Sequence, residues 1–241
     1  MTSRIDLYSW NTPNGRKITI ALAEMGLPYN LHPIKLSAKQ NYQPAFTAIS
    51  PSARIPAIID PIGPDGQPIS IFESGAILLY LARKSGLFLG NSERQRIEVE
   101  KWLMWQMGNF GPFCGQAEHF ATVAPKHQPP EALAYSQSRY IGETARLYGV
   151  LEAQLDNNPY VAGDFLSIAD IAIFPWATGW GVQGQDIAQF PNVENWLRRI
   201  AARPAVKHGV MVGADLRSDI VSESAAQIIL FGARPGQPQA T

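Results

Sequence analysis

Cysteine and histidine are scarce in this 241-residue chain. The single cysteine, Cys114, cannot form a disulfide within the chain, which favours a reducing compartment. Lys plus Arg number 20 and Asp plus Glu number 20, and this zero net charge argues against a nucleic-acid-binding protein. The histidines show no ligand spacing with one another or with Cys114, so we predict no metal site: His32, His119, His127 and His208.

Long apolar runs are missing as well. No stretch approaches the roughly 18 apolar residues of a membrane-spanning helix, and residues 1–6 lack the apolar run of a signal peptide. The chain also has no glycine-rich phosphate-binding loop. These absences lead us to expect a cytoplasmic protein without a membrane partner.

Strand and helix patterns alternate in the first part of the chain. Residues 4–9 alternate between apolar and polar positions, which predicts a strand, and a helix with an apolar stripe follows up to Gly26. The expected order is strand, helix, strand, helix, strand, strand, helix. The ranges are 4–9, 13–26, 29–36, 42–49, 54–60, 68–72 and 74–86.

After Gly90 only helical patterns remain. We expect Pro112 to kink or break the first of these helices and Pro204 to stop the last one. The domain boundary should lie near residues 86–92, and residues 234–241 should form a loose tail. The expected helices span 92–120, 131–155, 167–179 and 190–203.

Three local motifs carry candidate chemistry. Thr12-Pro13-Asn14-Gly15 lies at the start of the first helix, where unpaired N–H groups attract an anion such as a thiolate. Lowering a thiol pKa from about 8.5 by about two units requires about 2.7 kcal/mol, which a hydroxyl, an amide and a helix start can supply together. Alternatively, Thr12 or Asn14 only caps the helix.

The other two motifs flank the expected hairpin. Arg54-Ile55-Pro56 leads into the third strand, where an isolated Ile-Pro would be an ordinary edge-strand proline. Glu73-Ser74 opens the third helix, where Ser74 alternatively serves as its N-terminal cap.

These three motifs, in this order, resemble the cytosolic glutathione transferases over roughly residues 4–210. The Thr-Pro-Asn-Gly pattern is similar to the Nu class of bacterial transferases and to the related yeast nitrogen-regulator prion protein. The resemblance implies a thioredoxin-like α/β domain over 1–87, with Pro56 in cis. It also implies an all-helical domain over 92–210 that forms a second-substrate pocket, and a C-terminal extension over 211–241.

The resemblance also implies roles for these residues towards glutathione as co-substrate. Thr12 and Asn14 would address its sulfur, and the backbone of Ile55 would pair with its cysteine as an added strand would. Glu73 would pair with the ammonium group of the γ-glutamyl end. Ser74 would donate to the carboxylate of the same end.

Two further contacts are implied by the same class. Asn41, favoured over Gln40, would bind the glycine end of glutathione. Arg139 would reach the glutathione of the partner subunit in a homodimer; its alternative is an ordinary solvated arginine on a helix.

Two residues near the end of the first strand stay open as alternatives for thiolate activation. Several animal classes place a catalytic tyrosine near the position of Tyr8, and serine plays this part in other classes, which gives Ser9 as a third option. Cys114 lies in the helical half, so it cannot be the nucleophile of the cysteine-type classes and should be a buried small residue.

The helical half contributes a structural motif and pocket candidates. Ser167 and Asp170 form a capping box, so we expect Asp170 to be structural. Within a larger aromatic set, Phe113 and Phe120 are the better candidates to line a second-substrate pocket. That set comprises Trp105, Phe110, Phe113, Phe120, Trp176 and Trp180.

By this resemblance the leading hypothesis is an enzyme that reduces disulfides with glutathione, with modest conjugation or peroxidase activity beside it. One alternative is a conjugating transferase that uses Tyr8. The other is a binding or regulatory protein, because the same fold also serves as a non-catalytic module.

Overall fold

In the computed structural model, residues 3–214 are described. Four strands form one mixed sheet in the order β2-β1-β3-β4. The pair β1 and β2 is parallel, and its crossover is made by helix α1, whereas β3 pairs antiparallel with both β1 and β4. The strands are β1 (Ile5–Ser9), β2 (Tyr29–Pro33), β3 (Ala57–Asp60) and β4 (Ile69–Phe72).

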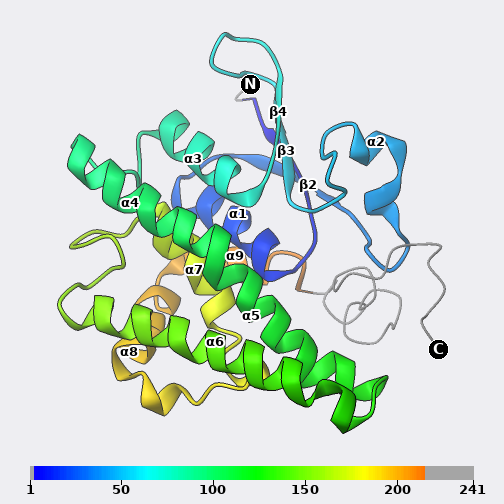
Figure 1. Cartoon of the computed structure of the whole chain (residues 1–241). Coiled ribbons are helices and arrows are strands. Elements are labelled where there is room, and N and C mark those ends of the chain that lie inside the picture. Colours follow the sequence, from blue (N-terminus) through cyan, green and yellow to red (C-terminus); the bar gives the residue numbers. More distant parts are fainter. Residues whose placement is uncertain (1–2, 215–241) are drawn as a thin grey trace.

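The alternation in β1 divides the two faces of the sheet. Ile5, Leu7 and Ser9 are buried, whereas Asp6 and Tyr8 are half-buried on the opposite face. The first face is covered by α1 (Pro13–Glu24) and α3 (Ser74–Ser85), and α2 (Pro44–Thr47) lies on the other side (Figure 1). The predicted strand and helix order is therefore confirmed.

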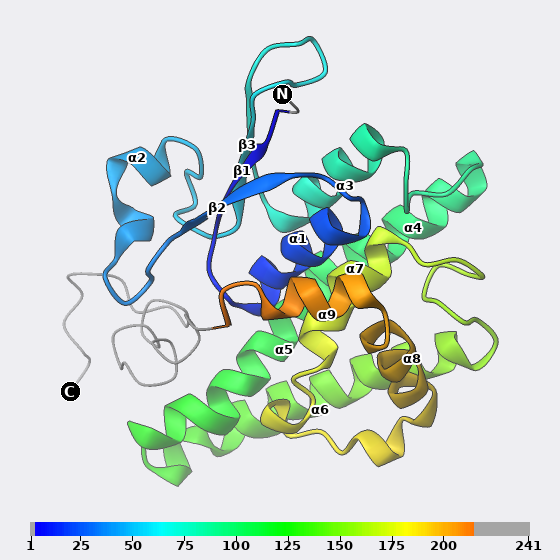
Figure 2. The same cartoon turned by 180° about the vertical axis from the view of Figure 1, so that it is seen from behind.

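Residues 86–92 connect this sheet unit to six helices. Helix α7 is almost entirely buried and lies against α1, so a single apolar core runs from the sheet through α7 into the helical half (Figure 2). The helices are α4 (Glu93–Trp105), α5 (Gly111–Glu118), α6 (Pro130–Asp156), α7 (Ile168–Ala177), α8 (Pro191–Ala201) and α9 (Pro204–Met211).

The structure bears out two predictions about prolines and adds to one of them. The long helix is interrupted by a π-helical turn at Gln106–Phe110, directly before Pro112, which is the second residue of α5. Pro204 does follow the end of α8, but it also begins α9, which the sequence pattern missed. A proline at the first helical position is compatible with a stop and with a new start.

Smaller differences concern the ends of segments. The second strand ends at Pro33 rather than at residue 36, and a short 3₁₀ turn, Ala124–Lys126, precedes α6. Of the expected extension over 211–241, residues 215–241, including the expected loose tail at 234–241, lie outside the described residues.

The structural role of Asp170 is confirmed. Its buried carboxylate accepts hydrogen bonds from the backbone N–H groups of Val161 at 2.9 Å and Ser167 at 3.0 Å, from the Ser167 hydroxyl at 2.9 Å and from the Trp196 indole at 2.9 Å. Cys114 is buried as expected, and burial raises the pKa of its thiol well above the ordinary value. That thiol is therefore a poor nucleophile.

Candidate functional site

The hydroxyl group of Thr12, at the start of α1, can donate a hydrogen bond to a ligand. Thr12 is the N-cap, and its Oγ1 accepts the N–H of Gly15 at 3.2 Å, so the hydrogen of the hydroxyl remains available to another acceptor. Gly15 is required here, because a Cβ at that position would lie 2.1 Å from the carbonyl oxygen of Trp10. Of the two predicted caps, Thr12 is the one that the structure uses.

Asn14, two residues later, is held by a residue from the other half of the chain. Its Oδ1 accepts a hydrogen bond from the indole Nε1 of Trp176 in α7 at 2.9 Å. Because an indole nitrogen only donates, the atom that faces it has to be the oxygen of the amide. No other described residue hydrogen-bonds to the Asn14 side chain, so the two hydrogens on Nδ2 are left for a ligand.

The start of α3 forms a second anion-attracting end. Glu73 is the N-cap, with φ at +70°, and its side chain makes no capping hydrogen bond. Ser74 is the first helical residue rather than the cap, which corrects the alternative reading of this motif. The first N–H groups of α3 therefore lack a side-chain acceptor and can receive an anion.

A buried lysine lies beside this helix start. The Nζ of Lys17 on α1 is 2.6 Å from Oε1 of Gln106, 3.3 Å from Oγ of Ser74 and 3.5 Å from Sδ of Met107. Burial lowers the pKa of Lys17 to about 7, against an opposing effect of the Glu73 charge. The sequence analysis missed this residue, although its spacing of four from Ala21 places it on the buried stripe of α1.

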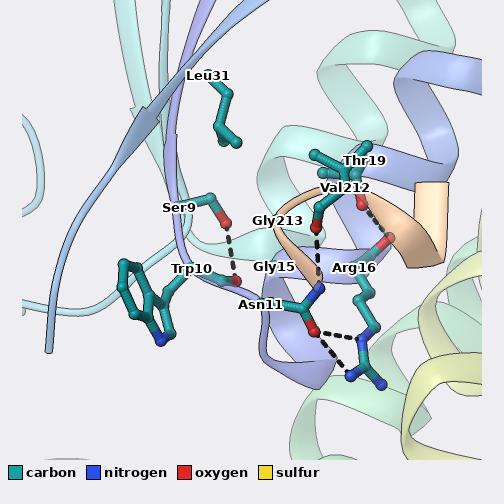
Figure 3. A pocket seen from close by; sticks show the side chains of 9 residues that line it. All are labelled: Ser9, Trp10, Asn11, Gly15, Arg16, Thr19, Leu31, Val212 and Gly213. Carbon is teal, nitrogen blue, oxygen red and sulfur yellow. Dashed lines mark hydrogen bonds between the residues drawn. The ribbon is translucent and has the colours of Figure 1, made fainter. Parts of the chain in front are cut away.

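A small pocket lies where the loop after β1 meets the chain after α9 (Figure 3). The Nδ2 of Asn11 donates to the carbonyl of Val212 at 2.8 Å, and its Oδ1 accepts from two guanidinium nitrogens of Arg16 at 3.0 and 2.8 Å. The hydroxyl of Thr19 donates to the carbonyl of Gly209 at 2.7 Å. These contacts hold the residue that precedes Thr12 against the end of α9.

Comparisons with known proteins decide the family. Residues 3–83 match the model of the glutathione S-transferase N-terminal domain, and residues 116–204 match that of the C-terminal domain. The disulfide-bond oxidoreductase YfcG of Escherichia coli (strain K12) is 46% identical over 218 residues, which cover 89% of this chain and 99% of that protein. The chain belongs to the glutathione S-transferase family.

Solved structures of glutathione transferases agree with this assignment. A family member from Pseudomonas fluorescens Pf-5, with two glutathione molecules bound, has a TM-score of 0.81 and 41% identity, and the match covers 86% of this chain and 92% of that one. A glutathione transferase from Pseudomonas putida, with one glutathione disulfide per subunit, has a TM-score of 0.81 and 41% identity, covering 87% and 92%. The predicted fold and family are confirmed.

The proline motif of the transferase fold is present as expected. The Ile55–Pro56 peptide bond is cis. The side chain of Ile55 is half-buried against a small cluster of Trp10, Ile34 and Leu36, and its backbone forms no hydrogen bond with any residue in 3–214. Its N–H and C=O are therefore available for a strand-like partner.

The structure places the two remaining predicted glutathione contacts at different depths. Asn41 is only 2% exposed, and its Nδ2 donates to the carbonyl of Ala53 at 3.0 Å, which ties it to the loop before Ile55. Its Oδ1 accepts no hydrogen bond from residues 3–214, and the neighbouring Gln40 accepts the N–H of Lys35 at 2.7 Å. Arg139 is exposed on α6.

Tyr8 and Ser9, the alternative residues on β1, lack the surroundings expected of a hydrogen-bond donor to a thiolate. Tyr8 stacks on His32, with ring centroids 4.7 Å apart, and burial followed by the Asp6 charge raises the pKa of its phenol. The hydroxyl of Ser9 is buried and donates to the carbonyl of Trp10 at 3.4 Å.

The aromatic set is divided by the fold. Phe110 is fully buried in the core, whereas Phe113 and Phe120 are half-buried, with ring centroids 6.2 and 5.2 Å from the ring of Tyr140. Within residues 3–214 no group of three or more His, Cys, Asp or Glu side chains is placed to hold a metal ion. The same part of the chain contains no helix long and apolar enough to cross a membrane.

Proposed function

We propose that this chain binds glutathione as a thiolate and uses it to reduce disulfides. The observation that carries the proposal is the pair of free donors at the start of α1. Thr12 and Asn14 each use an oxygen to accept a hydrogen bond from the protein, so the hydroxyl hydrogen and the amide hydrogens are left for the sulfur. Related transferases whose crystal structures contain glutathione or glutathione disulfide support glutathione as the ligand.

Two charge-assisted hydrogen bonds are sufficient for the required activation. Each hydrogen bond to a charged group contributes about 1.5–3 kcal/mol. Lowering the thiol pKa by about two units requires about 2.7 kcal/mol. The helix start adds a further favourable interaction with the negative sulfur.

The reaction requires two glutathione molecules. The first thiolate attacks one sulfur of the substrate disulfide, forms a mixed disulfide and expels the other sulfur as a thiolate, which takes up a proton. A second thiolate then attacks the glutathione sulfur of the mixed disulfide, which yields glutathione disulfide and a second thiol. Cys114 is buried, so both electrons come from glutathione. The relatives with two glutathione molecules or with glutathione disulfide fit this stoichiometry.

The other end of glutathione is assigned to the proline motif and α3. The backbone of Ile55 pairs with the cysteine of glutathione, Glu73 pairs with its ammonium group, and Ser74 donates to its α-carboxylate. Asn41 stays a prediction for the glycine end, and its side chain is buried in this structure. A reducing, cytoplasmic compartment would supply the reduced glutathione.

We also propose a homodimer. Ile97 and Met104 on α4 are 55% and 51% exposed and lie on one face of that helix, and Tyr135 on α6 is 77% exposed. Arg139 lies one turn after Tyr135, so an interface over α6 would carry it towards the partner's glutathione. Light scattering at micromolar concentration should give the mass of a dimer. A monomer mass would refute both the proposed homodimer and the proposed role of Arg139.

Glutathione-dependent reduction of hydroxyethyl disulfide tests the activity. We expect a clear rate for the wild type, a collapse in Thr12→Ala or Asn14→Ala, and survival in Tyr8→Phe. A loss confined to Tyr8→Phe would identify a tyrosine-type transferase instead. Tight glutathione binding without any turnover would identify a binding or regulatory protein.

A further inference from the structure

No carboxylate within residues 3–214 contacts the ammonium group of Lys17. Lys17 is 1% exposed, and its three neighbours are the neutral side chains of Gln106, Ser74 and Met107. Glu73 is an exposed residue that acts on it only through its field. A buried cation without a contacting counter-charge is costly, so its retention at this place calls for a function.

The neighbours of Lys17 are closely packed. Gln106 and Met107 come from the π-helical turn between α4 and α5. A Cβ on Gly75 would lie 3.0 Å from Cγ of Met107, and a Cβ on Gly111 would lie 2.6 Å from Nε2 of Gln106. Since Gly75 and Gly111 allow this close approach, the π-helical turn packs tightly against α3 and the start of α5, and Oε1 of Gln106 is directed at Lys17.

The lysine decides what the hydroxyl of Ser74 can do. When Lys17 carries its proton, the ammonium group only donates, so Oγ of Ser74 accepts from Lys17 and the hydroxyl hydrogen is directed elsewhere. Its present acceptor is Sδ of Met107 at 3.6 Å, which is a weak acceptor. A carboxylate at the start of α3 would be a far better one, and it would also bring the missing negative charge.

We propose that Lys17 is a positioning residue of the carboxylate subsite: it holds Ser74 as a donor and supplies the buried positive charge for the α-carboxylate of the γ-glutamyl group. The inference rests on the proposed function and names the part of glutathione that this cluster selects. It predicts that the charge of Lys17 strengthens the binding of ligands that have this carboxylate and does not change the rate of the reaction at sulfur.

Calorimetric titration with two ligands tests the assignment. The ligands are glutathione and γ-aminobutyryl-cysteinylglycine, which is glutathione without the α-carboxylate. For Lys17→Met we expect about tenfold or greater weakening of glutathione binding and an unchanged affinity for the analogue, because the charge of Lys17 and its hold on the Ser74 hydroxyl act on a carboxylate that only glutathione has. In the disulfide assay the KM for glutathione should rise, while kcat stays close to the wild-type value.

A second variant covers the case that Lys17→Met does not fold. Gln106→Glu is nearly isosteric and places a carboxylate where Oε1 now lies 2.6 Å from Nζ, so it gives Lys17 an internal counter-charge. It should weaken glutathione in the same selective way. Lys207→Met removes the charge of an exposed lysine on α9 and is the matched control, expected to bind both ligands like the wild type.

The outcomes separate this inference from the proposed function. Equal weakening of both ligands in Lys17→Met and Gln106→Glu would mean a merely structural role and would overturn the assignment. Equal affinity of the wild type for both ligands would also overturn it, with glutathione binding itself intact. Failure of the wild type to bind either ligand would refute the proposed function instead.

Discussion

The substitution Asn14→Asp isolates the amide donor at the sulfur position. An aspartate keeps the shape of the side chain and still accepts the indole hydrogen of Trp176, so the contact between α1 and α7 is preserved. What disappears is the donating Nδ2, and a second negative charge appears beside the thiolate. The prediction therefore concerns electrostatics at the sulfur and not the packing of the helix.

The magnitude follows from one lost charge-assisted hydrogen bond. Such a bond contributes about 1.5–3 kcal/mol, and 1.36 kcal/mol corresponds to one pKa unit, so the pKa of the bound thiol should rise by about one to two units. Repulsion from the carboxylate adds to this rise. With a wild-type thiol pKa of about 6.5, the thiolate fraction and the disulfide-reduction rate at pH 7 should then fall about 3- to 25-fold, and activity should return as the pH is raised.

The assay is the ultraviolet absorbance of the thiolate of bound glutathione, recorded against pH. Asn195→Asp makes the same change at an exposed position on α8 and serves as the control, with an unaltered thiol pKa expected. An unchanged pKa in Asn14→Asp, at full glutathione occupancy, would refute the donor role of the amide.

Two further predictions concern stability, measured by urea unfolding. Asp170→Ala leaves four buried donors without an acceptor and should lower the free energy of unfolding by about 3–5 kcal/mol. Asp170→Asn should lose less. A loss below about 1 kcal/mol for the alanine variant would contradict the hydrogen-bond network around Asp170. In Gly209→Ala the new Cβ would lie 2.6 Å from Cα of Ile20, so α9 has to move and about 1–3 kcal/mol is lost. At the open position Gly142 on α6 the same change should be stabilising by about 1 kcal/mol, and equal effects at both glycines would argue against close α1–α9 packing.

Local patterns were sufficient for much of the fold. The alternation from Ile5 to Ser9 predicted β1, and Thr12 with Pro13 predicted the start of α1, because each signal depends on neighbours within a few residues. The same reasoning was ambiguous at Pro204, since proline is tolerated in the first turn of a helix and excluded from its interior. The start of α9 depends on its packing against α1, which no local pattern records.

The candidate site divides in the same way. The sequence by itself determined that hydroxyl and amide groups stand at two helix starts, because caps and turns are set by adjacent residues. Only the tertiary structure decided which atom of Asn14 is free and why Lys17 is buried, since their partners, Trp176 and Gln106, lie 162 and 89 residues away. Side-chain periodicity marks a residue as facing inward, but it carries no information about which distant group meets it there.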